Sequence, residues 1–206
     1  MEGLRGDVPA QVGSFRKLVV GITGASGAVY AYRFLTRCSE IRRKYSDVYV
    51  IYTENSIEVF KQEIGSEPAS VFSSIKCVST TYHAGDWSSP LASSSNLIDT
   101  DCVIVPASLN TIAKLANGIQ DNLLLRVASS INRLKGKLVI VLRETPLSSI
   151  DLENLYKLSI NGAVILPASP AFYIKPTSID ELIDFVVGKI MDTLGIEHSL
   201  YKRWST

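Results

Sequence analysis

The chain has 206 residues, of which 46% are apolar and 20% are charged, as in folded globular proteins and unlike disordered or coiled-coil chains. Its formal net charge is +1, so no overall field attracts nucleic acid or an anionic membrane, and neither is an expected partner. A chain of this length fits one α/β domain that buries its core without disulfides or structural metal ions.

We divide the chain into an N-terminal extension, residues 1–16, and a single domain, residues 17–206. The extension is rich in small and polar residues, so we expect it to be flexible. It has no apolar signal-peptide core, and no segment reaches the roughly 18 consecutive apolar residues of a membrane span, so a cytoplasmic protein is expected. Cys38, Cys77 and Cys102 are widely spaced and belong to no CxxC motif. This spacing predicts neither a disulfide nor a zinc site, and it implies a reducing compartment.

Short apolar runs alternate along the chain with longer amphipathic segments. The runs, which indicate strands buried on both faces, are residues 17–22, 48–52, 102–105, 138–142 and 163–166. The amphipathic segments indicate helices and include residues 28–41, 123–134 and 179–194. This alternation predicts an α/β protein with a Rossmann-like, doubly wound, three-layer α/β/α fold and a mainly parallel sheet.

Ligands of such sheets bind beyond the carboxyl ends of the strands, so we expect function in the loops that follow strands. The first of these loops is Gly21-Ile-Thr-Gly-Ala-Ser-Gly27. Its glycines would let the backbone approach a phosphate that the helix N-terminal amides bind, although a tightly packed turn is the alternative. The spacing is not G-x-G-x-x-G. Glu54, after the second strand, could nevertheless mimic the ribose-binding acid of an NAD site, so NAD is an alternative ligand at this point.

A second polar loop, Pro106-Ala-Ser-Leu-Asn-Thr111, closes the strand at 102–105 and begins another helix. Helix capping would explain Ser108 alone, but two hydroxyls and an amide in four residues favour a ligand site. Asn122 can cap the following helix, whose Arg126 and Arg133 are candidates to face a partner or a substrate phosphate. Surface exposure is an equal alternative for Arg133.

Arg143-Glu-Thr-Pro146 follows a fully apolar strand. A guanidinium at this position would bind an anionic ligand through two parallel hydrogen bonds, with a structural ion pair to Glu144 as the alternative. Glu144 could then serve in proton transfer.

After the last strand, residues 167–173 form a proline-rich loop that ends in Phe172 and Tyr173. Such a loop can wall an apolar substrate while Tyr173 keeps a hydroxyl for a phosphate, or it can simply pack. His83 and His198 lie in a polar loop and a tail, so neither indicates a catalytic triad or a metal site.

Together these motifs resemble the UbiX flavin prenyltransferases in order and spacing. The matching stretches are residues 21–27, 106–111, Asp121-Asn-Leu-Leu124, Arg143-Glu-Thr-Pro146 and Pro170-Ala-Phe-Tyr173. The resemblance extends from about residue 17 to Trp204. It implies transfer of a dimethylallyl group from dimethylallyl phosphate to N5 and C6 of reduced FMN, without a metal ion. The prenylated FMN would be supplied to a UbiD-type decarboxylase.

The resemblance also implies roles for individual residues. The FMN site would comprise Gly24, Ala25, Ser26, Thr53, Ser108, Leu109, Asn110, Thr111 and Arg143. Tyr173 and Lys189 would bind dimethylallyl phosphate. The catalytic groups would be Glu63, Arg126, Arg133 and Glu144, together with Ser26, and the aromatic walls would be Trp87 and Trp204. Trp204 would reach in from a neighbouring subunit of a homo-oligomer, which in this family extends to a dodecamer.

Three departures from the family pattern keep two alternatives open. Thr53 stands where the family commonly has serine, which preserves the hydroxyl. Ala107 and Asn110 replace a common cysteine and a common basic residue, so residues 106–111 are also similar to the Pro-Ala-Ser-Ala-Asn-Thr motif of flavin-dependent cysteine decarboxylases. Those enzymes use a histidine on the helix after the second strand, and this chain has none there. The other alternative, a noncatalytic FMN-binding protein, would need neither the substrate pair Tyr173 and Lys189 nor the acidic residues named above.

Overall fold

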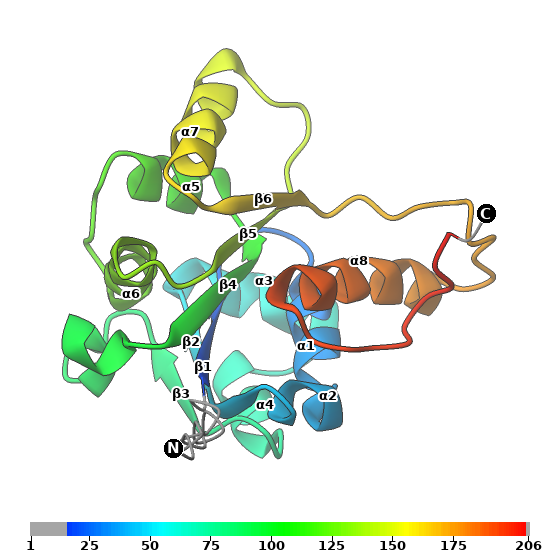
Figure 1. Cartoon of the computed structure of the whole chain (residues 1–206), viewed down its shortest axis with the longest axis horizontal. Coiled ribbons are helices and arrows are strands. Elements are labelled where there is room, and N and C mark those ends of the chain that lie inside the picture. Colours follow the sequence, from blue (N-terminus) through cyan, green and yellow to red (C-terminus); the bar gives the residue numbers. More distant parts are fainter. Residues whose placement is uncertain (1–15, 205–206) are drawn as a thin grey trace, which may run out of the picture.

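The structure is a computed structural model that describes residues 16–204, and it is built on one six-stranded sheet (Figure 1). The strands are β1 (Arg16–Ile22), β2 (Tyr45–Tyr52), β3 (Thr80–His83), β4 (Thr100–Ala107), β5 (Leu138–Leu142) and β6 (Val164–Pro167). Their order is β3-β2-β1-β4-β5-β6, and each pair of neighbours is parallel. The Rossmann-like α/β prediction is therefore confirmed.

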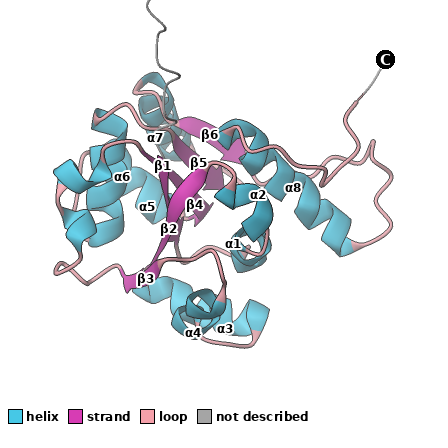
Figure 2. Ribbon diagram, turned by 60° about the horizontal axis from the view of Figure 1, so that its bottom comes forward, coloured by secondary structure: helices cyan, strands magenta, loops and turns pink. Residues whose placement is uncertain are grey.

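Helices cover both faces of the sheet and complete three layers (Figures 1 and 2). One face carries α1 (Ala28–Leu35), α2 (Cys38–Arg42), α3 (Glu54–Ile64), α4 (Pro68–Ser74) and α8 (Ile179–Leu194). The other carries α5 (Leu109–Ala116), α6 (Leu123–Arg133), α7 (Ser149–Ile160) and two short 3₁₀ turns, η1 (Pro90–Ala92) and η2 (Ser94–Leu97). Alternate residues of one strand enter opposite cores: Val20 packs with α8 and Val19 packs with α6.

The predicted elements and the structure differ at two places. The segment 28–41 is not one helix, because Arg37 has non-helical dihedrals between α1 and α2. Its guanidinium binds Asp184 of α8 at 3.0 Å, a contact across 147 residues that local spacing cannot reveal. Strand β3 was missed because this short edge strand is half exposed and has no continuous apolar run.

The predicted N-terminal extension lies outside the described residues except for Arg16, with which β1 begins. The division into residues 1–16 and 17–206 therefore stays a prediction. None of the helices described between residues 16 and 204 is long and apolar enough to cross a membrane.

The sheet order creates a switch point between β1 and β4. From β1 the chain continues through α1 and α2 to β2 on one side, whereas β4 continues through α5 and α6 to β5 on the other. The loops that follow β1 and β4 therefore diverge and leave a crevice at the carboxyl edge, the usual ligand position in open α/β sheets.

The cysteine prediction is wrong for two of the three residues. Cys38 and Cys77 form a disulfide, with Cα atoms 5.2 Å apart, while Cys102 is a buried free thiol. The cysteines are 39 residues apart in sequence, but each lies just ahead of one of two neighbouring parallel strands, β2 and β3. The inference of a reducing compartment assumed that the cysteines are unpaired, so the disulfide removes the support for it.

Reduction of this disulfide should lower stability. In the chain-entropy model, a disulfide that closes a 39-residue loop adds about 4 kcal/mol to the free energy of unfolding, because it restricts the unfolded chain. For a protein of this size, its loss lowers Tm by roughly 8–16 °C. Scanning calorimetry with and without a thiol reductant measures the change. Cys38→Ser is the control, because its Tm should already be low and should not respond to reductant. Equal Tm values for the oxidised and reduced wild type would contradict the prediction.

Candidate active site

The hydroxyl of Thr23 joins the two loops that flank the switch point. Thr23 directly follows β1 and is only 2% exposed. Its Oγ1 donates to the carbonyl of Pro106 and accepts from the backbone N–H of Ser108, both at 2.8 Å. The glycine-rich turn and residues 106–111 therefore lie side by side, as the sequence predicted.

A pocket opens between these loops and the start of α3. It is lined by Gly24, Thr53, Glu54, Asn55, His83, Ala84, Gly85, Ser108, Asn110, Thr111, Lys114, Asn122 and Leu125. Gly24 is required for the close packing here, because an added Cβ would lie 2.7 Å from Cβ of Asn55 and 2.9 Å from its carbonyl oxygen. Thr53 stands at the N-terminus of α3 without capping it through its side chain, so its hydroxyl is available to a ligand.

Helix capping and pocket lining coincide in the loop after β4. Ser108 accepts from the N–H of Thr111 and so caps α5, and its hydroxyl lies 3.1 Å from that of Thr111. Asn122 caps α6 in the same way, accepting from Leu125 at 2.9 Å. Leu109, in contrast, packs against the apolar core.

Three side chains from different elements gather around the start of α1. The N–H of Gly27 donates to both carboxylate oxygens of Glu63, at 2.9 and 3.0 Å. Burial raises the pKa of the nearby Tyr30, Arg143 lowers it, and Glu63 raises it further. The Nε of Arg143 is buried without a hydrogen-bond partner among the described residues. The carboxylate of Glu63 thus occupies the amide of Gly27, and the expected binding of an anion at the start of α1 stays a prediction.

Several predicted site residues do not line this pocket. They are Ala25, Ser26, Glu63, Trp87, Leu109, Arg126, Arg133, Arg143 and Glu144. Glu144 is exposed and accepts from the N–H of Thr145 at 3.1 Å. Arg126 donates to the carbonyl of Ala92, and Arg133 donates to serine hydroxyls of its own helix. Trp87 is half exposed beyond β3. Their catalytic roles stay predictions.

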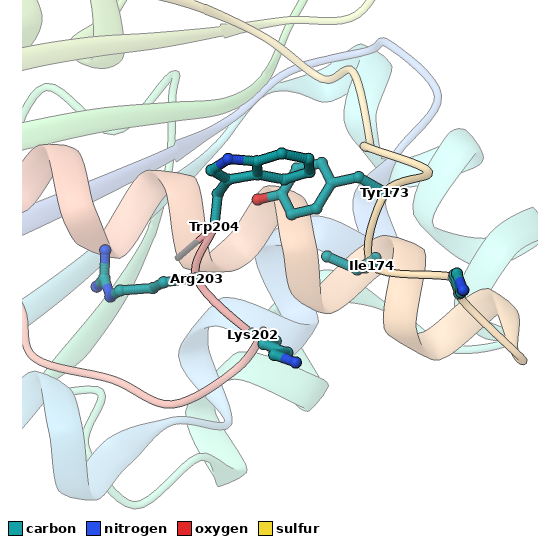
Figure 3. A pocket seen from close by; sticks show the side chains of 6 residues that line it. Tyr173, Ile174, Lys202, Arg203 and Trp204 are labelled. Carbon is teal, nitrogen blue, oxygen red and sulfur yellow. The ribbon is translucent and has the colours of Figure 1, made fainter. Parts of the chain in front are cut away.

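Tyr173 and Trp204 lie instead in a second pocket (Figure 3), and Lys189 of α8 interacts electrostatically with Tyr173. This pocket is lined by Tyr173, Ile174, Lys175, Lys202, Arg203 and Trp204. The rings of Tyr173 and Trp204 meet edge to face, with centroids 5.1 Å apart. The Lys189 ammonium lies 5.3 Å from the ring centre of Phe185. Trp204 therefore contacts Tyr173 of its own chain, and its reach into a neighbouring subunit stays a prediction.

The chain resembles known flavoproteins over most of its length. Residues 9–191 match the Flavoprotein family model. Flavin prenyltransferase UbiX of Methanocaldococcus jannaschii is 42% identical over 191 residues, which cover 92% of this chain and 99% of the relative. The protein of the same name from Aquifex aeolicus is also 42% identical, over 92% of this chain and 98% of its own length. The chain belongs to the UbiX flavin prenyltransferase family.

Solved structures agree with this membership. The crystal structure of AnUbiX (PadA1) in complex with FMN and dimethylallyl pyrophosphate superposes with a TM-score of 0.85 at 32% identity, covering 94% of this chain and 99% of that one. A dodecameric FMN-dependent UbiX-like decarboxylase from Escherichia coli gives a TM-score of 0.84 at 29% identity, with 92% and 100% covered. The peptidyl-cysteine decarboxylase EpiD shares only the fold, at 16% identity and a TM-score of 0.57 over 88% and 99% of the two chains.

Sequence reasoning missed Thr23, Tyr30, Asn55 and His83 as site residues. His83 accepts from the N–H of Gly85 through Nδ1, and its Nε2 lies 3.1 Å from a carboxylate oxygen of Glu54. Recognition of β3 would have placed His83 at the carboxyl edge with the other site residues, because it ends that strand.

Replacing Thr23 by valine should weaken both the fold and the pocket. The change keeps the shape but leaves the buried N–H of Ser108 without its partner, which costs about 1–3 kcal/mol of unfolding free energy. Flavin binding should weaken as well, because the two loops lose both side-chain hydrogen bonds between them and keep only the longer backbone bond from Thr23 to Pro106. Urea unfolding and flavin titration measure both effects. Thr23→Ser is the matched control, since it keeps the hydroxyl and loses one methyl group. If both variants behaved alike, the hydroxyl would not be the link between the loops.

Proposed function

We propose that this protein is a flavin prenyltransferase that transfers a dimethylallyl group from dimethylallyl phosphate to N5 and C6 of reduced FMN. The observation that carries the proposal is the polar pocket at the switch point, between the loops joined by Thr23. Arg143, whose Nε has no partner among the described residues, interacts with Tyr30, which lies beside Gly27 of the first loop. Membership of the UbiX family supports the reaction, and a structural relative was crystallised with FMN and dimethylallyl pyrophosphate.

The residues of the pocket suit FMN better than NAD. The absence of a side chain at Gly24 allows close backbone approach, and hydroxyls from Thr53, Ser108 and Thr111 line the same space. The buried guanidinium of Arg143 can bind an anionic or carbonyl oxygen. Glu54, the candidate ribose-binding acid of an NAD site, lies against His83 instead.

Bound reduced FMN supplies the two ring positions that receive the prenyl group. In the proposed reaction Lys189 and the hydroxyl of Tyr173 hold the phosphate, which leaves with the electrons of its bond to the allylic carbon. The rings of Tyr173 and Trp204 stabilise positive charge on the allyl group through cation-π contact. When the first bond forms, the released phosphate takes the proton that N5 gives up and then protonates the remaining double bond of the prenyl group. Glu144 or the phosphate accepts the proton that C6 loses when it attacks the resulting carbocation.

No metal ion takes part in the proposed reaction. Within residues 16–204, no group of three or more His, Cys, Asp and Glu side chains is arranged to hold one. Full activity after treatment with a chelator is the expected result.

Mass analysis of the flavin tests the function directly. After incubation with reduced FMN and dimethylallyl phosphate, the flavin should gain the mass of one prenyl unit. Titration with FMN and NAD as competing ligands should show a clear preference for FMN. Recovery of unmodified flavin would remove the transferase assignment and favour a noncatalytic FMN-binding protein, and tighter binding of NAD would revive the Glu54 alternative.

Glu144→Gln should slow turnover while leaving flavin affinity nearly unchanged. The substitution keeps the size and hydrogen-bonding reach of the side chain but removes its acid-base function. General acid-base catalysis contributes about 100- to 10,000-fold, so a loss of kcat in that range is expected in single-turnover measurements. A variant with wild-type turnover would exclude Glu144 from the mechanism.

Tyr173→Phe provides the contrast to Glu144→Gln. Loss of one charge-assisted bond to a phosphate should raise the KM for dimethylallyl phosphate by the equivalent of about 1.5–3 kcal/mol, with little effect on flavin binding. If both variants failed only in binding flavin, the division between cofactor and substrate residues would be incorrect.

We also expect the protein to be a homo-oligomer, as large as a dodecamer, that supplies prenylated FMN to a UbiD-type decarboxylase in the cytoplasm. Large apolar side chains stand exposed on the single chain, among them Tyr156, Ile160 and Phe172, each more than 60% exposed. A structural relative is described as dodecameric. Small-angle scattering should give a mass several times that of one chain, and a strictly monomeric active protein would contradict the expectation.

A further inference from the structure

The C-terminal segment, residues 198–204, runs back along α8 and is fastened to it by one carboxylate (Figure 1). Asp192, near the end of α8, accepts hydrogen bonds from three residues of the segment: from His198 Nε2 at 3.1 Å, from the Tyr201 hydroxyl, and from an Arg203 guanidinium nitrogen at 2.6 Å. Burial alone would raise the pKa of Asp192, but these hydrogen bonds lower it. The carboxylate is therefore held as an anion at the centre of the contact.

The orientation of His198 is fixed from both sides of its ring. Its Nδ1 accepts from the backbone N–H of Leu200 at 3.1 Å, so in the neutral ring the proton is on Nε2 and is donated to Asp192. The side chain of His198 is only 1% exposed. The start of the segment is thus packed as closely as a core residue.

A glycine within α8 makes room for this segment. A Cβ added at Gly188 would lie 2.5 Å from Cε1 of Tyr201 and 2.8 Å from Cε1 of His198. Glycine is disfavoured in the interior of a helix, so its presence here needs a packing reason. The close approach of the two rings to the helix backbone supplies that reason.

Docked in this way, the segment touches both of the residues assigned to the substrate phosphate. The Tyr201 ring lies beneath the Lys189 ammonium, with 5.0 Å from Nζ to the ring centre. Interaction with the Tyr201 hydroxyl raises the pKa of Lys189, against the opposing effect of burial. At the end of the segment, Trp204 meets Tyr173 edge to face (Figure 3).

We propose that Asp192 is a positioning residue for the binding of an alkyl phosphate: it fastens the C-terminal segment to α8, so that Tyr201 and Trp204 hold Lys189 and Tyr173 in place. The inference rests on the proposed function for the assignment of Lys189 and Tyr173 to the phosphate. It adds Asp192, Gly188 and the segment, none of which contacts the phosphate in this scheme.

The direction in which anion affinity changes when Asp192 is neutralised distinguishes positioning from simple electrostatics. Asp192 carries a negative charge three residues from Lys189, so its neutralisation should tighten the binding of an anion if charge alone mattered. Positioning gives the opposite result, because the loosened segment leaves Lys189 and Tyr173 free to adopt other rotamers. The loss of order lowers affinity.

The experiment measures the Kd of dimethylallyl phosphate by calorimetry on protein loaded with oxidised FMN, which does not undergo the transfer. Asp192→Asn should raise this Kd about tenfold, and Lys189→Met should raise it by about ten- to a hundredfold. In the double variant the further loss caused by Asp192→Asn should be clearly smaller than tenfold, because the part of its effect that acts through Lys189 is already gone and only the part that acts through Tyr173 remains. Asp180→Asn, at the exposed opposite end of α8, is the matched control and should bind like the wild type.

Gly188→Ala separates positioning from stability. Alanine favours the helix but displaces the rings of Tyr201 and His198, so the Kd for dimethylallyl phosphate should rise without a fall in Tm, while FMN affinity stays unchanged. Wild-type affinity in both Asp192→Asn and Gly188→Ala would overturn the inference and leave the proposed function intact. Tighter binding in Asp192→Asn, or an additive loss in the double variant, would also overturn it. Wild-type protein that binds FMN but no dimethylallyl phosphate would refute the proposed function itself.

Discussion

The pocket at the switch point depends on the hydrogen bonds of Thr23. The connections that leave β1 and β4 run to opposite sides of the sheet, and the regular pairing of the two strands ends at Gly21 and Ile104. Beyond that point the backbone N–H of Thr23 still donates to the carbonyl of Pro106 at 3.3 Å, and the buried hydroxyl of Thr23 adds two shorter bonds, one donated and one accepted. A hydrogen bond buried in this way is costly to leave unmade, which makes the loop geometry rigid before any ligand arrives.

Around this link, each loop is held by contacts that do not use the ligand. Gly24 lies against Asn55, Ser108 caps α5, and Glu63 occupies the amide of Gly27. The polar groups that line the pocket are hydroxyls, amides and the side chains of Glu54, His83 and Lys114. A preorganised site of this kind loses little conformational entropy on binding, because its side chains are already positioned.

The sequence was sufficient wherever the signal is local. The strands of the centre, such as 102–105 and 138–142, are buried on both faces and therefore read as unbroken apolar runs, and the motifs that follow them lie at the predicted edge. Prediction from the sequence failed where a contact with a residue far along the chain determines the local structure. Arg37 ends α1 while binding Asp184, and Cys38 finds Cys77 only because β2 and β3 are neighbours. The carboxylate of Glu63 likewise reaches Gly27 across 36 residues.

The same limit explains why the sequence identified Lys189 only through family resemblance. Nothing near Lys189 in the sequence distinguishes it from any exposed lysine of a helix, and Gly188 beside it looks like a simple defect in helix propensity. The structural reason for both residues lies in residues 198–204, which fold back along α8. The ring of Tyr201 packs against Gly188 and also contacts the ammonium of Lys189. A lysine ammonium is strongly hydrated and sits on a flexible stem, so an aromatic surface that restricts it also defines where its charge can act. In the proposed scheme, the packing of residues 198–204 on α8 therefore specifies the phosphate-binding side of the molecule, whereas loops of the sheet specify the flavin side.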